Sequence, residues 1–320
     1  PVPADAAVSA DRSEDPYASL TTLIDRFTRH HLRRSRDPRD HHLAEVAVQR
    51  LRMLGTQITE TGHRPCASPA SRVIAYTQNT AAALIPILRK EIESLGSQLR
   101  SVVIADYEKT SATAAEISHL FDHEAGGAVA AFRSLLSDPL TNALDPVLVT
   151  GSTVLVDADL VVQFLSQAKM WLRRKSKNVS LVDHRRGEFC LIQGSGSDWC
   201  PRVYVELITE LFQRGTTRCL VGTRGLLGEG WDAQRVNVLI DLSTSTTSTS
   251  VNQLRGRSIR LDPHNAEKVA NNWDVVCIAP EFSRGLDDYQ RFHQKHQKIF
   301  GVCDDGAIEQ GIGHVPVSYT

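Results

Sequence analysis

Runs of Val, Ile and Leu alternate along this chain with stretches in which apolar residues recur at helical spacing. Because short continuous apolar runs are typical of strands buried on both faces, we expect a strand in each run. The runs cover residues 71–77, 101–107, 146–157, 178–183, 218–223, 236–242 and 273–279. Helices are expected at 79–96, 158–174 and 203–214, the last closed by Gly215. The alternation predicts an α/β fold with a mostly parallel sheet and helices on both faces.

Changes in this texture divide the chain into three expected regions. Residues 1–67 form a flexible lead-in and a helical connector, in which the apolar residues Leu20, Leu23 and Phe27 share one helix face. Residues 68–282 form the α/β domain, with an inserted α/β segment at about 110–200. Residues 283–320 form a C-terminal tail that packs on the sheet or on another domain.

The segment 29–42 concentrates Arg and His within the expected connector. Its adjacent His pairs lack the i, i+4 spacing that aims two imidazoles at one metal ion, so we predict no metal site there. A solvated basic face is the first interpretation, and contact with nucleic acid or a partner domain is the second.

Composition limits the possible partners. A chain of 320 residues with 41% hydrophobic content can bury a sizeable core. The formal charge is −1, so any contact with nucleic acid must come from a local cluster of cations. The six cysteines form no CxxC pair, and Cys219 and Cys277 lie in apolar runs, which indicates reduced, buried thiols.

No apolar run is long enough to span a membrane, and no signal peptide is recognisable, so we expect a soluble cytoplasmic protein without a membrane partner. It would be associated with the nucleoid if it acts on DNA. The sequence begins at Pro1 without an initiator Met, and we expect it to be an excised part of a longer protein.

Polar side chains stand where the expected strands end. These are Thr77, Asp106, Thr223 and Asp241. Because the carboxyl edge of a parallel sheet is where ligands bind, small hydroxyls and carboxylates there indicate a site. 

The loop after Thr223 contains Gly225, Gly228 and Gly230, with Glu229 and Asp232 on either side of Gly230. Glycines permit conformations that other residues resist and allow a ligand or a second chain to approach closely. A tight crossover turn explains the same residues equally well.

The next segment, "SVNQLRGRSIRLDP", predicts a helix with Ser250 as its N-cap. Gln253, Arg257 and Arg260 then project from one face, beside Gly256, which lets that face approach a partner. Two arginines on one face repel each other unless an anion lies between them, and a triphosphate or phosphodiester supplies one. The alternative interpretation is a pair of solvated arginines.

"GTRGLLGEGWD" followed by "QLRGRSIR" resembles motifs V and VI of superfamily two helicases and translocases. "RVIAYT" at 72–77 resembles motif IV, and the likeness is scattered over residues 70–282, the second RecA-like domain of that family. The resemblance implies that Arg257 and Arg260 reach the γ-phosphate of ATP across a cleft lined by Gln253.

The resemblance also implies two sets of binding residues. Asp232 would contact the ribose or a motif VI arginine, with Gly230, Glu229 and Gly256 beside the nucleotide. Thr223, its neighbour Arg224 and, with a weaker match, Thr77 would hold the nucleic-acid backbone.

The departures from the family concern the other half of the motor. The sequence has no G-x-x-x-x-G-K-[ST] and no Asp-Glu pair at a strand end. We therefore expect ATP and Mg²⁺ to be held mainly by a first RecA-like domain absent from this chain, and the chain alone to be inactive. Motif V, "LLGEGWD", favours DNA over RNA as the strand.

Two other functions remain open. One is a degenerate RecA-like module that only binds nucleic acid or protein, and the other is a nucleotide-binding α/β enzyme of unrelated chemistry. Within the insertion, Trp171 leads the basic stretch "WLRRKSK". This stretch either stacks a base and neutralises phosphates or simply ends a helix with cations that suit its dipole.

Overall fold

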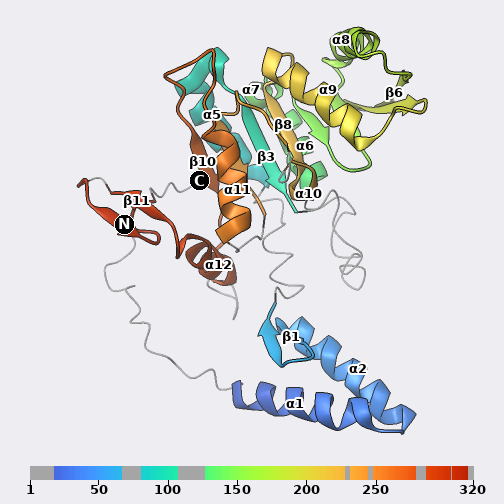
Figure 1. Ribbon diagram of the computed structural model, residues 1–320, viewed down its shortest axis with the longest axis vertical. Coiled ribbons are helices and arrows are strands. Elements are labelled where there is room, and N and C mark those ends of the chain that lie inside the picture. The colour runs from blue at the N-terminus through green and yellow to red at the C-terminus, as the bar shows by residue number, and fades with distance from the viewer. Residues whose placement is uncertain are drawn as a thin grey trace. The chain divides into compact units, whose positions relative to one another are not determined.

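The computed structural model separates residues 1–72 from residues 73–320 as two compact units, and each is described by itself (Figure 1). The structure describes residues 18–66, 81–106, 127–227, 231–243, 248–278, 286–303 and 305–315. The expected strand at 71–77 and its motif IV therefore lie outside the described residues.

The first unit is a helical hairpin followed by a small antiparallel ribbon. Its elements are α1 (Ala18–His30), η2 (Leu32–Arg34), α2 (Pro38–Met53), β1 (Thr56–Ile58) and β2 (His63–Pro65). The Asp37 carboxylate accepts from the Arg39 backbone and caps α2, and Pro38 occupies the first turn, where a missing N–H is tolerated. The apolar face expected on α1 exists, but Leu20, Leu23 and Phe27 are exposed.

The second unit contains an eight-stranded sheet in the order β10-β9-β3-β8-β4-β5-β7-β6. The strands are β3 (Ser101–Ala105), β4 (Val147–Val149), β5 (Val154–Asp157), β6 (Ser180–Arg186), β7 (Phe189–Ser195), β8 (Cys219–Thr223), β9 (Val238–Asp241) and β10 (Asn271–Asp274). The first five in this order pair in parallel, and the pairs β4-β5, β5-β7 and β7-β6 are antiparallel. An α/β fold is confirmed, with an antiparallel extension on a parallel half.

Two features of this extension differ from the expectation. The apolar run 146–157 is a hairpin rather than one strand, because the chain reverses where the Thr150 backbone N–H donates to the Thr153 carbonyl at 2.9 Å. Strand β7 was not predicted, because its burial alternates weakly and its sequence, "FCLIQGS", carries no long apolar run. It pairs with β6, whose side chains are exposed except for Leu181.

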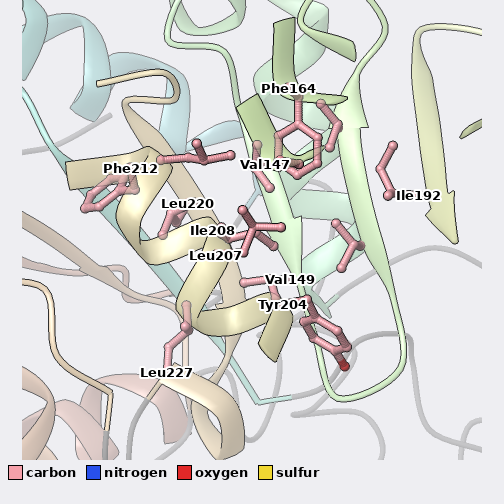
Figure 2. Packing of buried hydrophobic residues seen from close by; sticks show 14 of the residues in the cluster. Val147, Val149, Phe164, Ile192, Tyr204, Leu207, Ile208, Phe212, Leu220 and Leu227 are labelled. Carbon is pink, nitrogen blue, oxygen red and sulfur yellow. The ribbon is translucent and has the colours of Figure 1, made fainter. Parts of the chain in front are cut away.

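Helices cover both faces of the sheet, as the alternation predicts. α8 (Val161–Arg174) and α9 (Pro201–Arg214) pack on one face, and α5 (Leu84–Leu95) and α6 (Gly127–Ser137) pack on the other. Alternate residues of each central strand enter opposite cores: Leu220, labelled in Figure 2, faces α9, whereas Val221 belongs to the core on the side of α6. Figure 2 shows Leu207, Ile208 and Phe212 of α9 above these strands.

Local signals explain several boundaries. Gly215 ends α9 in the left-handed region, with φ of 85°, as expected for a helix stop. Gly96 follows α5, and Pro86 lies in the first turn of that helix, which a turn at Ala83 separates from the helical residues Ala81 and Ala82. η3 (Gly96–Gln98), α7 (Pro139–Asn142) and α10 (Arg224–Leu227) are short connecting turns.

The C-terminal part contains α11 (Ser248–Ser258), α12 (Asp287–His296) and an antiparallel pair, β11 (Phe300–Val302) and β12 (Ile308–Gln310). α12 packs against α11, so part of the expected tail lies on the α/β unit (Figure 1). Within the described ranges, no helix has the length and apolarity that crossing a membrane requires.

The six cysteines form no disulfide. Burial raises the pKa of the Cys219 thiol to about 12, so it stays protonated. Cys277 departs from the expectation, because β10 ends at Asp274 and this thiol is only half-buried.

Candidate functional site

The carboxyl ends of the parallel strands bring together residues that lie far apart in the sequence. β3 lies between β9 and β8, and Ala105 is in register with Thr223. Asp106, one residue beyond Ala105, therefore stands beside the end of β8. Its carboxylate is 3.6 Å from the Arg224 guanidinium, which is itself exposed.

The turn after β8 is tight for a reason that the sequence did not reveal. A Cβ on Gly222 would lie 2.4 Å from the Leu227 side chain, so glycine allows α10 to fold back on the strand. Gly225, which we expected to need an unusual backbone, lies in α10 with open space around it and no positive φ. That reason for Gly225 is wrong, and Gly228, Glu229 and Gly230 lie outside the described residues.

Trp231 fixes the chain where the loop rejoins the fold. Its indole is buried, and its N–H donates to the Thr209 hydroxyl of α9 at 2.7 Å. That hydroxyl donates in turn to the Val205 carbonyl at 2.6 Å. A satisfied, buried indole is a strong anchor, and it presents the next residue, Asp232, to solvent.

Helix α11 carries the motif VI residues, but both its start and its end differ from the prediction. It begins at Ser248, so Ser250 lies inside the helix and the predicted N-cap is wrong. It ends at Ser258, so Arg260 stands just beyond the helix rather than on it. Val251 and Leu254 are buried and hold the helix on the sheet.

Asp232 and Arg260, which are 28 residues apart, form an ion pair. Burial lowers the pKa of Arg257, the nearby charge of Arg260 lowers it further, and Asp232 opposes both. The three side chains therefore share one electrostatic environment. The Asp232–Arg260 pair is largely exposed, and such pairs contribute about 0–1 kcal/mol to stability.

A lysine missed by the sequence analysis holds the backbone of this group. Lys268 Nζ donates to the Arg260 carbonyl at 2.6 Å and to the Gln234 carbonyl at 2.7 Å. It thereby ties the segment after α11 to the segment after Asp232. Burial lowers the pKa of Lys268, which is consistent with its enclosed position.

Gln253 and Gly256 complete the predicted face. Gln253 is exposed on α11. Among the residues that the structure describes, no atom lies within 4 Å of a Cβ placed on Gly256, so none of their contacts requires glycine there. The open space leaves this surface accessible to another molecule.

A second group of charges lies buried under α11. Lys295 donates to Asp241 and Asp274, the last residues of β9 and β10. Arg255 donates to Asp274 at 2.6 Å and to His296 Nε2 at 2.5 Å. No periodicity or motif in the sequence connects these positions, although Asp241 was singled out as a polar strand end.

The charges in this cluster balance. Burial alone would raise the pKa of Asp274, but the charges of Lys295 and Arg255 outweigh it and hold the pKa below its usual value. Burial lowers the pKa of His296, and the charge of Arg255 lowers it further. His296 is therefore neutral, with Nδ1 donating to the Phe292 carbonyl at 2.9 Å. Two acids then face two cations.

The basic stretch of α8 does not stack a base. Trp171 is only 2% exposed, and its indole N–H donates to Glu210. Arg174 pairs with Glu210, and Lys175 pairs with Glu206 at 2.9 Å. The stacking interpretation is wrong, and cations at the end of the helix explain the pattern.

The arrangement can bind an anion at the exposed edge, where Arg257 and Arg260 lie together and Asp232 offers an acceptor to a hydroxyl. Thr223 and Arg224 offer a hydroxyl and a cation at the end of β8. Thr77 lies outside the described residues, and Asp106 is the strand end that the structure places beside Thr223.

The chain is similar to the Pyrococcus furiosus Hef helicase domain, with 13% identity and a TM-score of 0.32 over 79% of this chain. The match spans 32% of the Hef chain. No family model and no curated protein matches this sequence.

Proposed function

We propose that this chain is the C-terminal motor domain of an ATP-dependent nucleic-acid helicase or translocase of superfamily two. The observation that carries the proposal is the meeting of its two motifs in space. Asp232 from "GTRGLLGEGWD" is paired with Arg260 from "QLRGRSIR", and Arg257 lies in the same electrostatic environment. A crossover turn with unrelated solvated arginines would not require this meeting.

In the proposed role, Arg257 and Arg260 face ATP that is held, with Mg²⁺, by a first RecA-like domain outside this sequence. Charge develops on the phosphoryl oxygens as the γ-phosphate is transferred, and a guanidinium placed there stabilises it. Arginines supplied from a second domain contribute about a thousandfold or more in rate. Asp232 orients Arg260 or accepts a hydrogen bond from the ribose, while Gln253 and Gly256 allow close approach.

The strand is proposed to run along the neighbouring ends of β3 and β8. Thr223 is half-buried at the end of β8, and Arg224 is exposed beside it, 3.6 Å from Asp106. A backbone phosphate would compete with Asp106 for Arg224, because both are anions of similar hydrogen-bonding capacity. Closure of the two domains on ATP would then shift these contacts along the strand, which we propose to be DNA.

The test is steady-state ATP hydrolysis by the full-length gene product, measured alone, with single-stranded DNA and with single-stranded RNA. We expect at least tenfold stimulation by one of the strands, about 1.4 kcal/mol in activation free energy. The 320-residue chain alone is expected to show none. Strand binding without any hydrolysis by the full-length product would instead establish the binding-module alternative.

A further inference from the structure

Helix α11 carries two arginines that face different surroundings. Arg255 and Arg257 are two positions apart, so their side chains point about 200° away from each other around the helix. Arg257 is half-buried, and the charges of Arg260 and Asp232 act on it. Arg255 points into the buried cluster that contains Asp274 and His296.

Two residues of α11 that flank Arg257 in the sequence make polar contacts to β10. Arg255, two residues before it, bonds Asp274 at 2.6 Å. Ser258, one residue after it and completely buried, donates to the Asn272 side chain at 2.7 Å. Because hydrogen bonds are directional, these contacts fix both the rotation of α11 and its height over the sheet edge.

The acceptor Asp274 is itself held by α12. Lys295 bridges Asp274 and Asp241, and it is only 6% exposed, like Asp241. His296 follows it on α12 and accepts from Arg255. α12 thus contacts α11 directly and also through the ends of β9 and β10 (Figure 1).

Resting on the proposed function, we propose that Lys295 is a positioning residue for Arg257. Lys295 orients Asp274, and Asp274 binds Arg255 of α11. The position of α11, and therefore of Arg257, depends on these contacts. Buried ion pairs add little net stability compared with apolar packing, so their clearer effect is to define geometry. Geometry matters at this position, because a displacement of about 1 Å in a reacting group lowers rates about a hundredfold.

A double-mutant cycle on strand-stimulated ATP hydrolysis tests this, with the full-length gene product, Arg257→Ala, Lys295→Met and the double variant. If Lys295 acts through Arg257, Lys295→Met lowers kcat at least about tenfold when Arg257 is present and less than about threefold in the Arg257→Ala background. The matched control is Lys298→Met, an exposed lysine three residues later, for which wild-type kcat is expected.

Ser258→Ala provides a milder second variant, which removes one hydroxyl and keeps every charge. We expect it to lower kcat about two- to fivefold in the presence of Arg257 and to leave the Arg257→Ala background unchanged. If Lys295→Met lacks a cooperative melting transition, Ser258→Ala still measures whether the contacts between α11 and β10 set the position of Arg257.

An equal loss of kcat in both backgrounds would overturn the positioning role, because a general loss of folded protein lowers kcat whether or not Arg257 is present. Wild-type kcat in a folded Lys295→Met protein would overturn it as well. Failure of the proposed function looks different, because Arg257→Ala alone would then leave hydrolysis unchanged.

Discussion

Ion pairs at the ends of the parallel strands differ in burial from those on the helices that cover the sheet. In the parallel half, Asp241 and Asp274 end adjacent strands and are buried together with Lys295. On the helices that cover one face of the sheet, the pair between Lys175, at the end of α8, and Glu206 of α9 lies on the surface, with about half of each side chain exposed. Parallel strands all end at one edge, so their terminal side chains meet, whereas antiparallel ends alternate between two edges.

This difference in burial suggests different roles for the two halves of the sheet. The antiparallel extension enlarges the core through Trp171 and Phe164, and it also buries one acid, Asp157 at the end of β5, whose pKa is raised by burial. The parallel half carries a buried, charge-balanced cluster around Asp274 and a second, less buried group that contains half-buried Arg257 and exposed Asp232. We infer that ligand chemistry belongs to the parallel half.

The largest effect is expected from Asp274→Ala. The substitution leaves Arg255 and Lys295 buried with one acid between them, and breaking a buried pair in this way destabilises proteins by about 3–5 kcal/mol. Glu206→Ala removes the exposed acid that pairs with Lys175 and should cost less than about 1 kcal/mol.

Urea denaturation of both variants, followed by circular dichroism, measures these free energies of unfolding. Equal losses for Asp274→Ala and Glu206→Ala would remove the distinction between a buried and an exposed half.

A smaller effect is expected from acidification through His296. Its pKa in the folded protein lies below the ordinary value of 6.5 because of burial and then the charge of Arg255. Between these two values the unfolded chain binds more protons than the folded one, so stability falls as the pH drops below about 6.5. Protonation would add a cation facing Arg255 of α11 and Lys295 of α12, opposed by Asp274 of β10 and Asp241 of β9.

The measurement is the difference in unfolding free energy between the wild type and His296→Gln from pH 7 to pH 5.5. Wild type should lose stability relative to the variant as the pH falls. His184→Gln on the exposed strand β6 leaves the buried cluster unchanged, so its difference from wild type should stay constant. A constant difference for His296→Gln as well would contradict the buried, neutral imidazole.

The sequence predicts the fold where local signals are strong. The apolar run before Thr223 predicts β8, and the glycine at position 215 predicts the end of α9, because both depend on neighbours in the chain. The run 146–157 was misread as one strand, since only the four residues 150–153 between its two apolar pieces distinguish a hairpin from a continuous strand. The end of α11 was placed too late, because helix termini depend on tertiary contacts such as Ser258–Asn272.

The exposed layer of the site was largely predictable and the buried layer was not. Arg257, Arg260 and Asp232 were recognised from motif spacing, and the structure brings them together. Lys295 and Arg255 carry no local signal, because their contacts cross 54 and 19 residues of sequence. From the sequence alone, Lys295 in the polar helix α12 would be predicted to be solvated, because only the fold brings Asp241 and Asp274 to it.

If Arg257 stabilises a phosphoryl group in its transition state, the affinity for ADP with aluminium fluoride depends on this arginine. An interaction made mainly in the transition state should strengthen binding of this analogue and hardly affect ADP. In the full-length gene product with saturating strand, we predict that Arg257→Ala weakens the analogue at least about thirtyfold, or about 2 kcal/mol, and ADP less than about twofold. Lys169→Ala, which removes an exposed cation of α8, should change neither affinity. Unchanged affinity for the analogue in Arg257→Ala would contradict the account.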